Sequence, residues 1–136
     1  MACVVSARLA AWGFLAAGLG VLAVLYRCDP ATTRGFPPCL FHSLTGLYCP
    51  GCGSGRALHR LLHGDVAAAF DLNPLMVLVL PFVLFGLGVY WVRAVTGRRV
   101  CDFAVPAVWI RALLCVVLVY WVLRNVPVAP FCYLAP

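Results

Sequence analysis

Charged side chains are scarce in this sequence, and lysine is missing entirely. Only 10% of the 136 residues are charged, whereas soluble domains carry about 25%. Hydrophobic residues make up 65% of the chain. A soluble protein of this composition would be covered by large exposed apolar patches. The shortage of charge therefore argues against a soluble domain and predicts that lipid forms part of the solvent around this protein.

The net charge of +6 comes from arginine alone, because the ten basic residues include no lysine. These arginines stand mostly at the ends of apolar runs and do not gather in one patch. That distribution argues against a nucleic-acid partner and is typical of side chains that reach the headgroup level of a bilayer. The absent lysine also excludes the G-K-[ST] step of a phosphate-binding loop, although the chain has closely spaced glycines at 51, 53 and 55.

Three apolar runs predict an all-α integral membrane protein with three transmembrane helices at about 9–26, 75–92 and 106–123. The first two runs each hold 18 consecutive uncharged residues, close to the ~20 that cross a bilayer. Asn73 and Pro74 offer an N-cap and a first helical residue for the second run, and Pro81 should kink it. The third contains Arg111 near its start, where the side chain can snorkel to the interface.

The first run has a rival interpretation as a cleaved signal peptide, because Arg8 gives it a basic start. No A-x-A site follows it, and Arg27 before Cys28 spoils a lipoprotein cleavage box. We therefore expect the run to be retained as an anchor, so that residues 1–136 form a single membrane domain.

The loop 27–73 holds most of the polar residues. From Ser54 to His63, Arg56 and Arg60 stand four residues apart, as do His59 and His63, with leucines on the other side. This pattern predicts a short helix lying on the membrane surface. Gly64 can end that helix, and Asp65 can cap a further apolar turn.

The side of the membrane on which this loop lies depends on the arginines near the span ends. The arginine counts for the two sides of the membrane are equal, but the second loop is short and densely basic, with Arg93, Arg98 and Arg99. We therefore expect a multi-pass protein of the cell membrane whose long loop is extracytoplasmic.

A cysteine and histidine pattern, C-x2-H-x6-C-P-G-C-G, is the densest chemistry in the chain. Its members are Cys39, His42, Cys49 and Cys52, followed by Gly53. Four such ligands suit a closed tetrahedral zinc site, and the glycines at 51 and 53 permit a tight knuckle. Gly46 can turn the short link between the two halves back on itself. His59 and His63 are alternative ligands.

Two other chemistries fit the same residues. Cys49 and Cys52 form a C-x-x-C pair at a helix start, where backbone amides stabilise a thiolate, so that Cys49 would attack a disulfide and Cys52 would resolve it. Alternatively, either cysteine could pair with Cys39, Cys28 or Cys132 in a disulfide staple. Cys115 is expected to be a small apolar residue of the third span, and Cys3 and Cys101 to be free thiols.

The motif combination resembles a bacterial membrane family known as domain of unknown function 2752. The resemblance is carried by the segments 38–42, 45–53, 56–57, 64–65, 73–74 and 124–125. It implies a small multi-span membrane protein of uncharacterised activity in which Gly51, Gly53, Arg56, Asp65, Asn73, Pro74, Arg124 and Asn125 belong to the shared pattern. Gly55 departs from it, since threonine or serine is expected there.

These observations predict a binding or scaffold module whose cluster holds zinc or a disulfide at the membrane surface, with a membrane thiol oxidoreductase as the alternative. The expected partners are the lipid bilayer and either another membrane protein or a second copy of the chain. No nucleic acid is expected.

Overall fold

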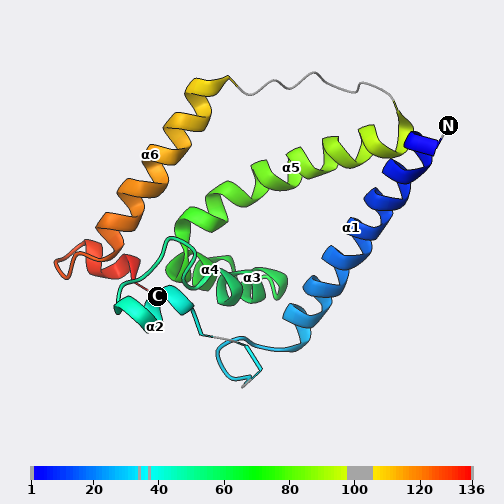
Figure 1. Cartoon of the computed structure of the whole chain (residues 1–136). Coiled ribbons are helices and arrows are strands. Elements are labelled where there is room, and N and C mark those ends of the chain that lie inside the picture. The colour runs from blue at the N-terminus through cyan, green and yellow to red at the C-terminus, as the bar shows by residue number, and fades with distance from the viewer. Residues whose placement is uncertain (1, 34, 37, 98–105, 136) are drawn as a thin grey trace. The chain divides into compact units, whose positions relative to one another are not determined.

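The computed structural model describes residues 2–33, 35–36, 38–97 and 106–135. These residues form six α-helices and one 3₁₀ helix, with no strand among them (Figure 1). The elements are α1 (Ala2–Arg27), α2 (Leu40–Thr45), α3 (Ser54–Leu62), α4 (Val66–Leu72), α5 (Pro74–Thr96), α6 (Ala107–Arg124) and η1 (Phe131–Leu134).

Three of these helices are long and apolar enough to cross a membrane, which confirms the predicted fold class. The qualifying segments are Arg8–Arg27, Pro74–Thr96 and Ala107–Arg124, with mean hydropathies of 2.0, 2.4 and 1.9. Helix α3 has only nine residues and is too short to span a bilayer, which needs about 20. Pro81 lies within α5, which continues on both sides of it. Arg98, Arg99 and Cys101 lie outside the described residues.

The chain divides into two compact units. Unit 1 comprises Met1–Val24 and Val79–Ala104, and unit 2 comprises Leu25–Leu78 and Val105–Pro136. Helices α1 and α5 therefore each contribute residues to both units, whereas α2, α3, α4, α6 and η1 belong to unit 2.

Unit 1 is built from apolar helix surfaces. Trp12 of α1 meets Trp91 of α5 edge to face, with ring centroids 5.1 Å apart and planes at 88°, a favoured aromatic geometry. Most large side chains of this unit are exposed, among them Phe14 at 73% and Phe82 at 77%. Such exposure is expected of helices whose outer surface faces lipid.

In unit 2, α3, α4 and α5 begin, and α3 ends, at the residues that the sequence indicated, whereas α2 was not predicted from the sequence. The Asp65 carboxylate accepts a hydrogen bond from Ala68 N at 3.1 Å and caps α4. The Asn73 side chain accepts one from Met76 N at 3.0 Å, and Pro74 is the first residue of α5. Gly64 follows α3 with φ +81°. These signals are local, since a side chain within three residues satisfies a free amide.

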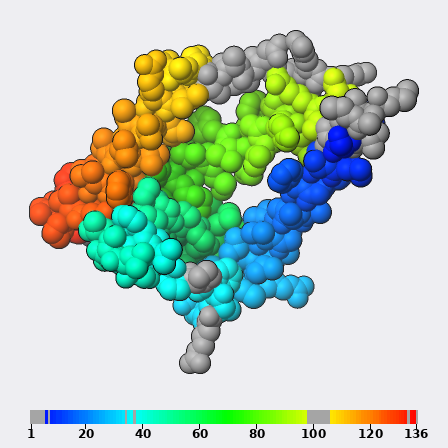
Figure 2. Space-filling view, viewed as in Figure 1, coloured from blue at the N-terminus to red at the C-terminus, as the bar shows by residue number. Residues whose placement is uncertain are grey.

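Small side chains let α3 and α4 pack closely. Ala57 of α3 and Ala69 of α4 are fully buried. On another side of unit 2, Phe41 of α2 contacts Trp121 of α6, with ring centroids 5.7 Å apart. Figure 2 shows the cyan surface of α2 beside the orange surface of α6. This packing brings the loop that carries the cysteines to the carboxyl end of α6.

Candidate metal centre

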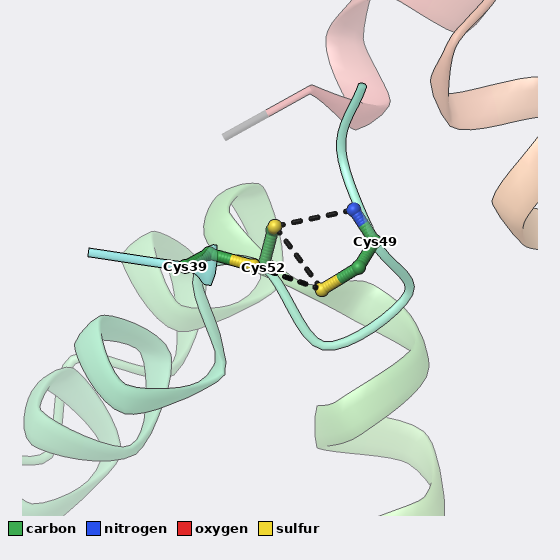
Figure 3. A group of neighbouring side chains, drawn as sticks. All are labelled: Cys39, Cys49 and Cys52. Carbon is green, nitrogen blue, oxygen red and sulfur yellow. Dashed lines mark hydrogen bonds between the residues drawn. The ribbon is translucent and has the colours of Figure 1, made fainter. Parts of the chain in front are cut away.

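Three cysteines of the long loop converge in unit 2. The sulfur of Cys49 lies 3.2 Å from that of Cys52 and 3.5 Å from that of Cys39, and all three sulfurs lie within 4.8 Å of one another (Figure 3). Cys39 immediately precedes α2, and the other two stand on the turn that leads into α3. Cys39 from the first half of the pattern therefore lies beside Cys49 and Cys52 from the second half, as predicted.

The turn from Cys49 to Gly53 has its own hydrogen bonds. Cys52 N donates to Cys49 O at 3.0 Å, and Cys49 N donates to the Cys52 sulfur at 3.2 Å. Gly53 has φ +82°, a conformation that side chains with a Cβ rarely adopt. Gly51 is exposed, and a Cβ there would lie 3.9 Å from the Cys49 sulfur, in ordinary contact. Gly53 is thus the glycine whose conformation the turn requires.

The link between the two halves folds back at Gly46, as predicted. Gly46 ends α2 with φ +73°, and its N–H donates to His42 O at 2.8 Å. The Thr45 hydroxyl then accepts a hydrogen bond from Leu47 N at 3.2 Å. This reversal returns the chain from α2 toward Cys49.

The three thiols have different electrostatic surroundings. The pKa of Cys39 is lowered, chiefly because the backbone N–H of His42 donates to its sulfur and also because of the other two thiols. Burial raises the pKa of Cys52 to about 12, with the neighbouring Cys49 and Cys39 thiols adding to the rise. Without a metal ion, Cys52 therefore keeps its proton at neutral pH, while Cys39 forms a thiolate more readily than an ordinary cysteine.

The staple alternative is not formed in this structure. A disulfide requires its sulfurs at about 2.05 Å, whereas the closest pair here is 3.2 Å apart. Cys28, Cys39, Cys49, Cys52, Cys115 and Cys132 are all free thiols. The cluster is therefore a set of potential thiolate ligands and not a cross-link.

Asn73 holds the cysteine turn from the start of α5. Its side chain is 1% exposed, and its amide nitrogen donates to Pro50 O at 3.0 Å, to Cys52 O at 3.4 Å and to the Ser54 hydroxyl at 2.9 Å. Its amide oxygen accepts from Met76 N and from the Tyr120 hydroxyl at 3.3 Å. One buried side chain thus caps α5 and also fixes the turn that carries Cys49 and Cys52.

Arg124 holds the same turn from the end of α6. It is 1% exposed, and one terminal nitrogen donates to Cys52 O at 2.7 Å and to Leu72 O at 3.0 Å. The other lies 3.0 Å from the Tyr120 hydroxyl and 3.4 Å from Pro50 O. The apolar run before Arg124 suggested a headgroup-level anchor, but the side chain is instead buried on the cysteine turn.

Asn125 completes this set by pairing with the residue before Cys49. Its amide oxygen accepts from Tyr48 N at 2.8 Å, and its amide nitrogen donates to Tyr48 O at 2.8 Å and to Trp121 O at 2.9 Å. The last residue of α6 and its C-cap residue therefore bind backbone before the cysteine pair, at Tyr48, and within it, at Pro50 and Cys52.

The three histidines lie outside the group of three sulfurs. His42 donates from Nδ1 to Leu47 O at 3.3 Å, and its ring stacks on Tyr48 with centroids 4.6 Å apart. His59 donates from Nδ1 to Leu25 O at 2.6 Å. His63 stacks against Tyr26 at 4.5 Å and contacts the His59 ring at 4.4 Å. The structure thus separates a thiol cluster from a second aromatic and histidine cluster at the end of α1.

Two participants were not predicted from the sequence. The Tyr120 hydroxyl joins Asn73 to Arg124, and the carbonyl of Pro50 accepts from both of them. Tyr120 stands four residues before Arg124, a helical spacing that could have paired them. A backbone carbonyl has no signature in the sequence, so its role required the tertiary structure. Arg56, a member of the predicted pattern, is half-buried on α3.

A cavity of about 320 Å³ lies beside this set of contacts. Its lining includes Leu47, Tyr48, Arg124, Asn125 and Cys132. The backbone of Tyr48 and the Asn125 amide are already paired with each other, so the walls are formed mainly by satisfied groups and apolar side chains.

Comparison with known proteins gives a family match over part of the chain. Residues 39–87 match the sequence model of the family described as "Protein of unknown function (DUF2752)". Over these residues the chain is similar to that family. The match confirms the resemblance noted from the sequence, and it includes all three clustered cysteines, Asn73 and the first part of α5. No curated protein and no solved structure matches the chain.

Proposed function

We propose that this protein is a membrane-anchored metal-binding module in which Cys39, Cys49 and Cys52 bind a zinc ion. The observation that carries the proposal is the convergence of three sulfurs from two separate segments of the loop, all within 4.8 Å of one another. Among the residues that the structure describes, these cysteines form the only group of three or more side chains placed to hold a metal ion. All three lie within the segment 39–87 that matches the DUF2752 family model.

The sulfur spacing suits a metal ion better than a disulfide. Zinc binds thiolate sulfur at about 2.3 Å, so two sulfurs on a tetrahedral ion lie about 3.8 Å apart. The observed separations of 3.2 and 3.5 Å reach that value with small side-chain movements. Thiolates select soft or borderline ions such as Zn²⁺ and Cu⁺ over Mg²⁺ or Ca²⁺, and three cysteines leave a fourth position on zinc.

The fourth position is open to water, to a ligand from a partner, or to His42. His42 stands at the start of the same pattern, but its ring is stacked on Tyr48. It would have to leave that stack to bind the ion. A site with three protein ligands and one exchangeable position is typical of zinc that reacts or is transferred, whereas a fourth protein ligand makes a structural site.

The expected setting is the surface of the cell membrane, on the extracytoplasmic side. Helix α3 has an arginine and histidine face that is costly to place in hydrocarbon, and the loop it belongs to connects two membrane-spanning helices in the sequence. A metal ion on this loop would brace the loop at the interface. It would also form a docking point for another membrane protein or a second copy.

A membrane thiol oxidoreductase is the second candidate, favoured by the 3.2 Å between the Cys49 and Cys52 sulfurs. Cys49 would attack a protein disulfide, form a mixed disulfide and release one thiol. Cys52 would then attack the Cys49 sulfur, release the second thiol and leave a Cys49–Cys52 disulfide, so that two electrons pass to the substrate. Burial raises the pKa of Cys52 to about 12, which disfavours the thiolate that this second step needs.

Metal analysis combined with thiol counting tests the proposal on the purified full chain in detergent. We expect one zinc per chain and three thiols that resist alkylation until a chelator is added. The variants His59→Gln and His63→Gln should keep the zinc, because these rings lie in the separate cluster, and Cys115→Ser is a matched cysteine control. A metal-free protein that isolates with a Cys49–Cys52 disulfide would instead establish the redox candidate.

Removal of one ligand should loosen the loop. Cys39→Ser and Cys52→Ser should each destabilise it by about 2–5 kcal/mol, the scale of a lost cross-link or structural metal, while the three spans remain inserted. Limited proteolysis of reconstituted protein should then cut within 27–73 faster than in the wild type and in Cys115→Ser. Unchanged cleavage in both variants would show that these cysteines do not act together.

A further inference from the structure

The Arg124 side chain is a buried cation whose hydrogen-bond partners, among the residues that the structure describes, are all uncharged. It is 1% exposed, and within the described residues its hydrogen bonds end on three carbonyls and the Tyr120 hydroxyl. Its Nε atom is buried without a hydrogen-bond partner there. Removing a guanidinium from water is costly, and buried charges are normally compensated by an opposite charge.

The groups that Arg124 contacts belong to the proposed metal centre. Its shortest hydrogen bond, 2.7 Å, ends on the carbonyl of Cys52, and another ends on that of Pro50. A divalent ion bound by three thiolates and a neutral fourth ligand carries one net negative charge. One guanidinium balances that charge, and the interaction is strong where water is excluded.

We propose that Arg124 is a positioning residue of the metal centre, which orients the Cys49–Cys52 turn and supplies the positive charge that balances a divalent ion held by three thiolates. This inference rests on the proposed function. It assigns the carboxyl end of the third membrane-spanning helix a direct part in metal affinity, and it makes that affinity depend on the charge at position 124 as well as on hydrogen bonding.

Charge and hydrogen bonding can be separated by comparing two substitutions. Both Arg124→Lys and Arg124→Gln lose the forked donor geometry of the guanidinium, but only Gln loses the charge. Arg111→Gln is the control, because Arg111 is an exposed arginine of the same helix whose hydrogen bond goes to Ala107 O. If Arg124→Gln does not fold, as judged by circular dichroism and gel filtration, Arg124→Met replaces it.

The experiment titrates Co²⁺ into the reduced full chain in detergent and follows the thiolate-to-cobalt charge-transfer band, with Zn²⁺ competition to give relative affinities. We expect Arg124→Gln to weaken binding about 10–100-fold, the scale of lost outer-shell partners, with Arg124→Lys much closer to the wild type and Arg111→Gln unchanged. Equal loss of metal affinity in Arg124→Lys and Arg124→Gln would show that Arg124 acts only through its hydrogen bonds, and would overturn the assignment of its charge. Wild-type affinity in Arg124→Gln would overturn the inference altogether, whereas absence of the band in the wild type would overturn the proposed function itself.

Discussion

Both units of this protein depart from the usual pattern of buried apolar and exposed polar side chains, unit 1 by exposing apolar groups and unit 2 by burying polar ones. Unit 1 exposes large apolar groups such as Phe14 and Phe82, and unit 2 buries Asn73 and Arg124 almost completely. The first arrangement is stable because lipid tails are as apolar as the side chains they surround. The second is stable because Asn73 and Arg124 donate hydrogen bonds to the carbonyls of Pro50 and Cys52 in the cysteine turn. Lipid-facing apolar surface therefore characterises unit 1. Unit 2 also exposes apolar side chains on α6, such as Trp109 at 67%, but specific hydrogen bonds hold its cysteine turn.

The largest expected effect is the loss of the buried amide in unit 2. Asn73→Ala should lower the free energy of unfolding by about 4 kcal/mol, because it removes a helix cap worth about 1 kcal/mol and takes a hydrogen-bond partner from the Ser54 and Tyr120 hydroxyls, at about 1–3 kcal/mol each. Unfolding in detergent mixtures measures this change. Phe82→Ala, at a side chain that is 77% exposed, is the control from unit 1 and should stay within about 0.5 kcal/mol. Similar losses in the two variants would remove the contrast between the units.

A charge placed in unit 1 should have the next largest effect. Phe82 lies well inside α5, where exchanging phenylalanine for arginine raises the free energy of membrane insertion by about 3 kcal/mol. We expect Phe82→Arg to reduce insertion of α5 in a glycosylation-reporter assay, whereas Arg56→Lys in unit 2 leaves it unchanged. Full insertion of the Phe82→Arg variant would mean that this surface of α5 does not face lipid.

The smallest predicted effect concerns the different thiols of unit 2 in the metal-free protein. Because burial raises the pKa of Cys52 to about 12 from 9.0, its thiolate is scarce near pH 8. A thiolate of higher pKa is a stronger nucleophile, but this offsets only part of the loss in thiolate concentration. Alkylation of Cys52 should therefore be about 50-fold slower than that of an ordinary thiol. Cys39, with its lowered pKa, should react first, and its rate should level off at a lower pH than that of Cys52. Peptide mapping after timed alkylation gives both rates, and the opposite order would contradict the assigned surroundings of these thiols.

Several parts of the candidate site were predictable because they depend on neighbours in the chain. The left-handed conformation of Gly46, the Asp65 cap and the Asn73-Pro74 start of α5 all follow from residues within a few positions of one another. The convergence of Cys39 with Cys49 and Cys52 was also predicted, since the short link limits how far apart they can lie. His42 was expected beside them, but its ring stacks on Tyr48, a preference that depends on side-chain rotation and that spacing does not reveal.

By itself, the sequence determined the three helices long enough to span a membrane, the short helices α3 and α4 and the proximity of the cysteines, because hydrophobic length, helix caps and short loops act locally. It did not predict the short helix α2. Only the tertiary structure decided that Arg124 contacts the cysteine turn and that Asn125 contacts the backbone of Tyr48 beside it, each across more than seventy residues. The physical reason is that an arginine after an apolar run has two ways to satisfy its charge, in the headgroups or on buried carbonyls. The choice depends on whether a distant segment folds back with its carbonyl groups free.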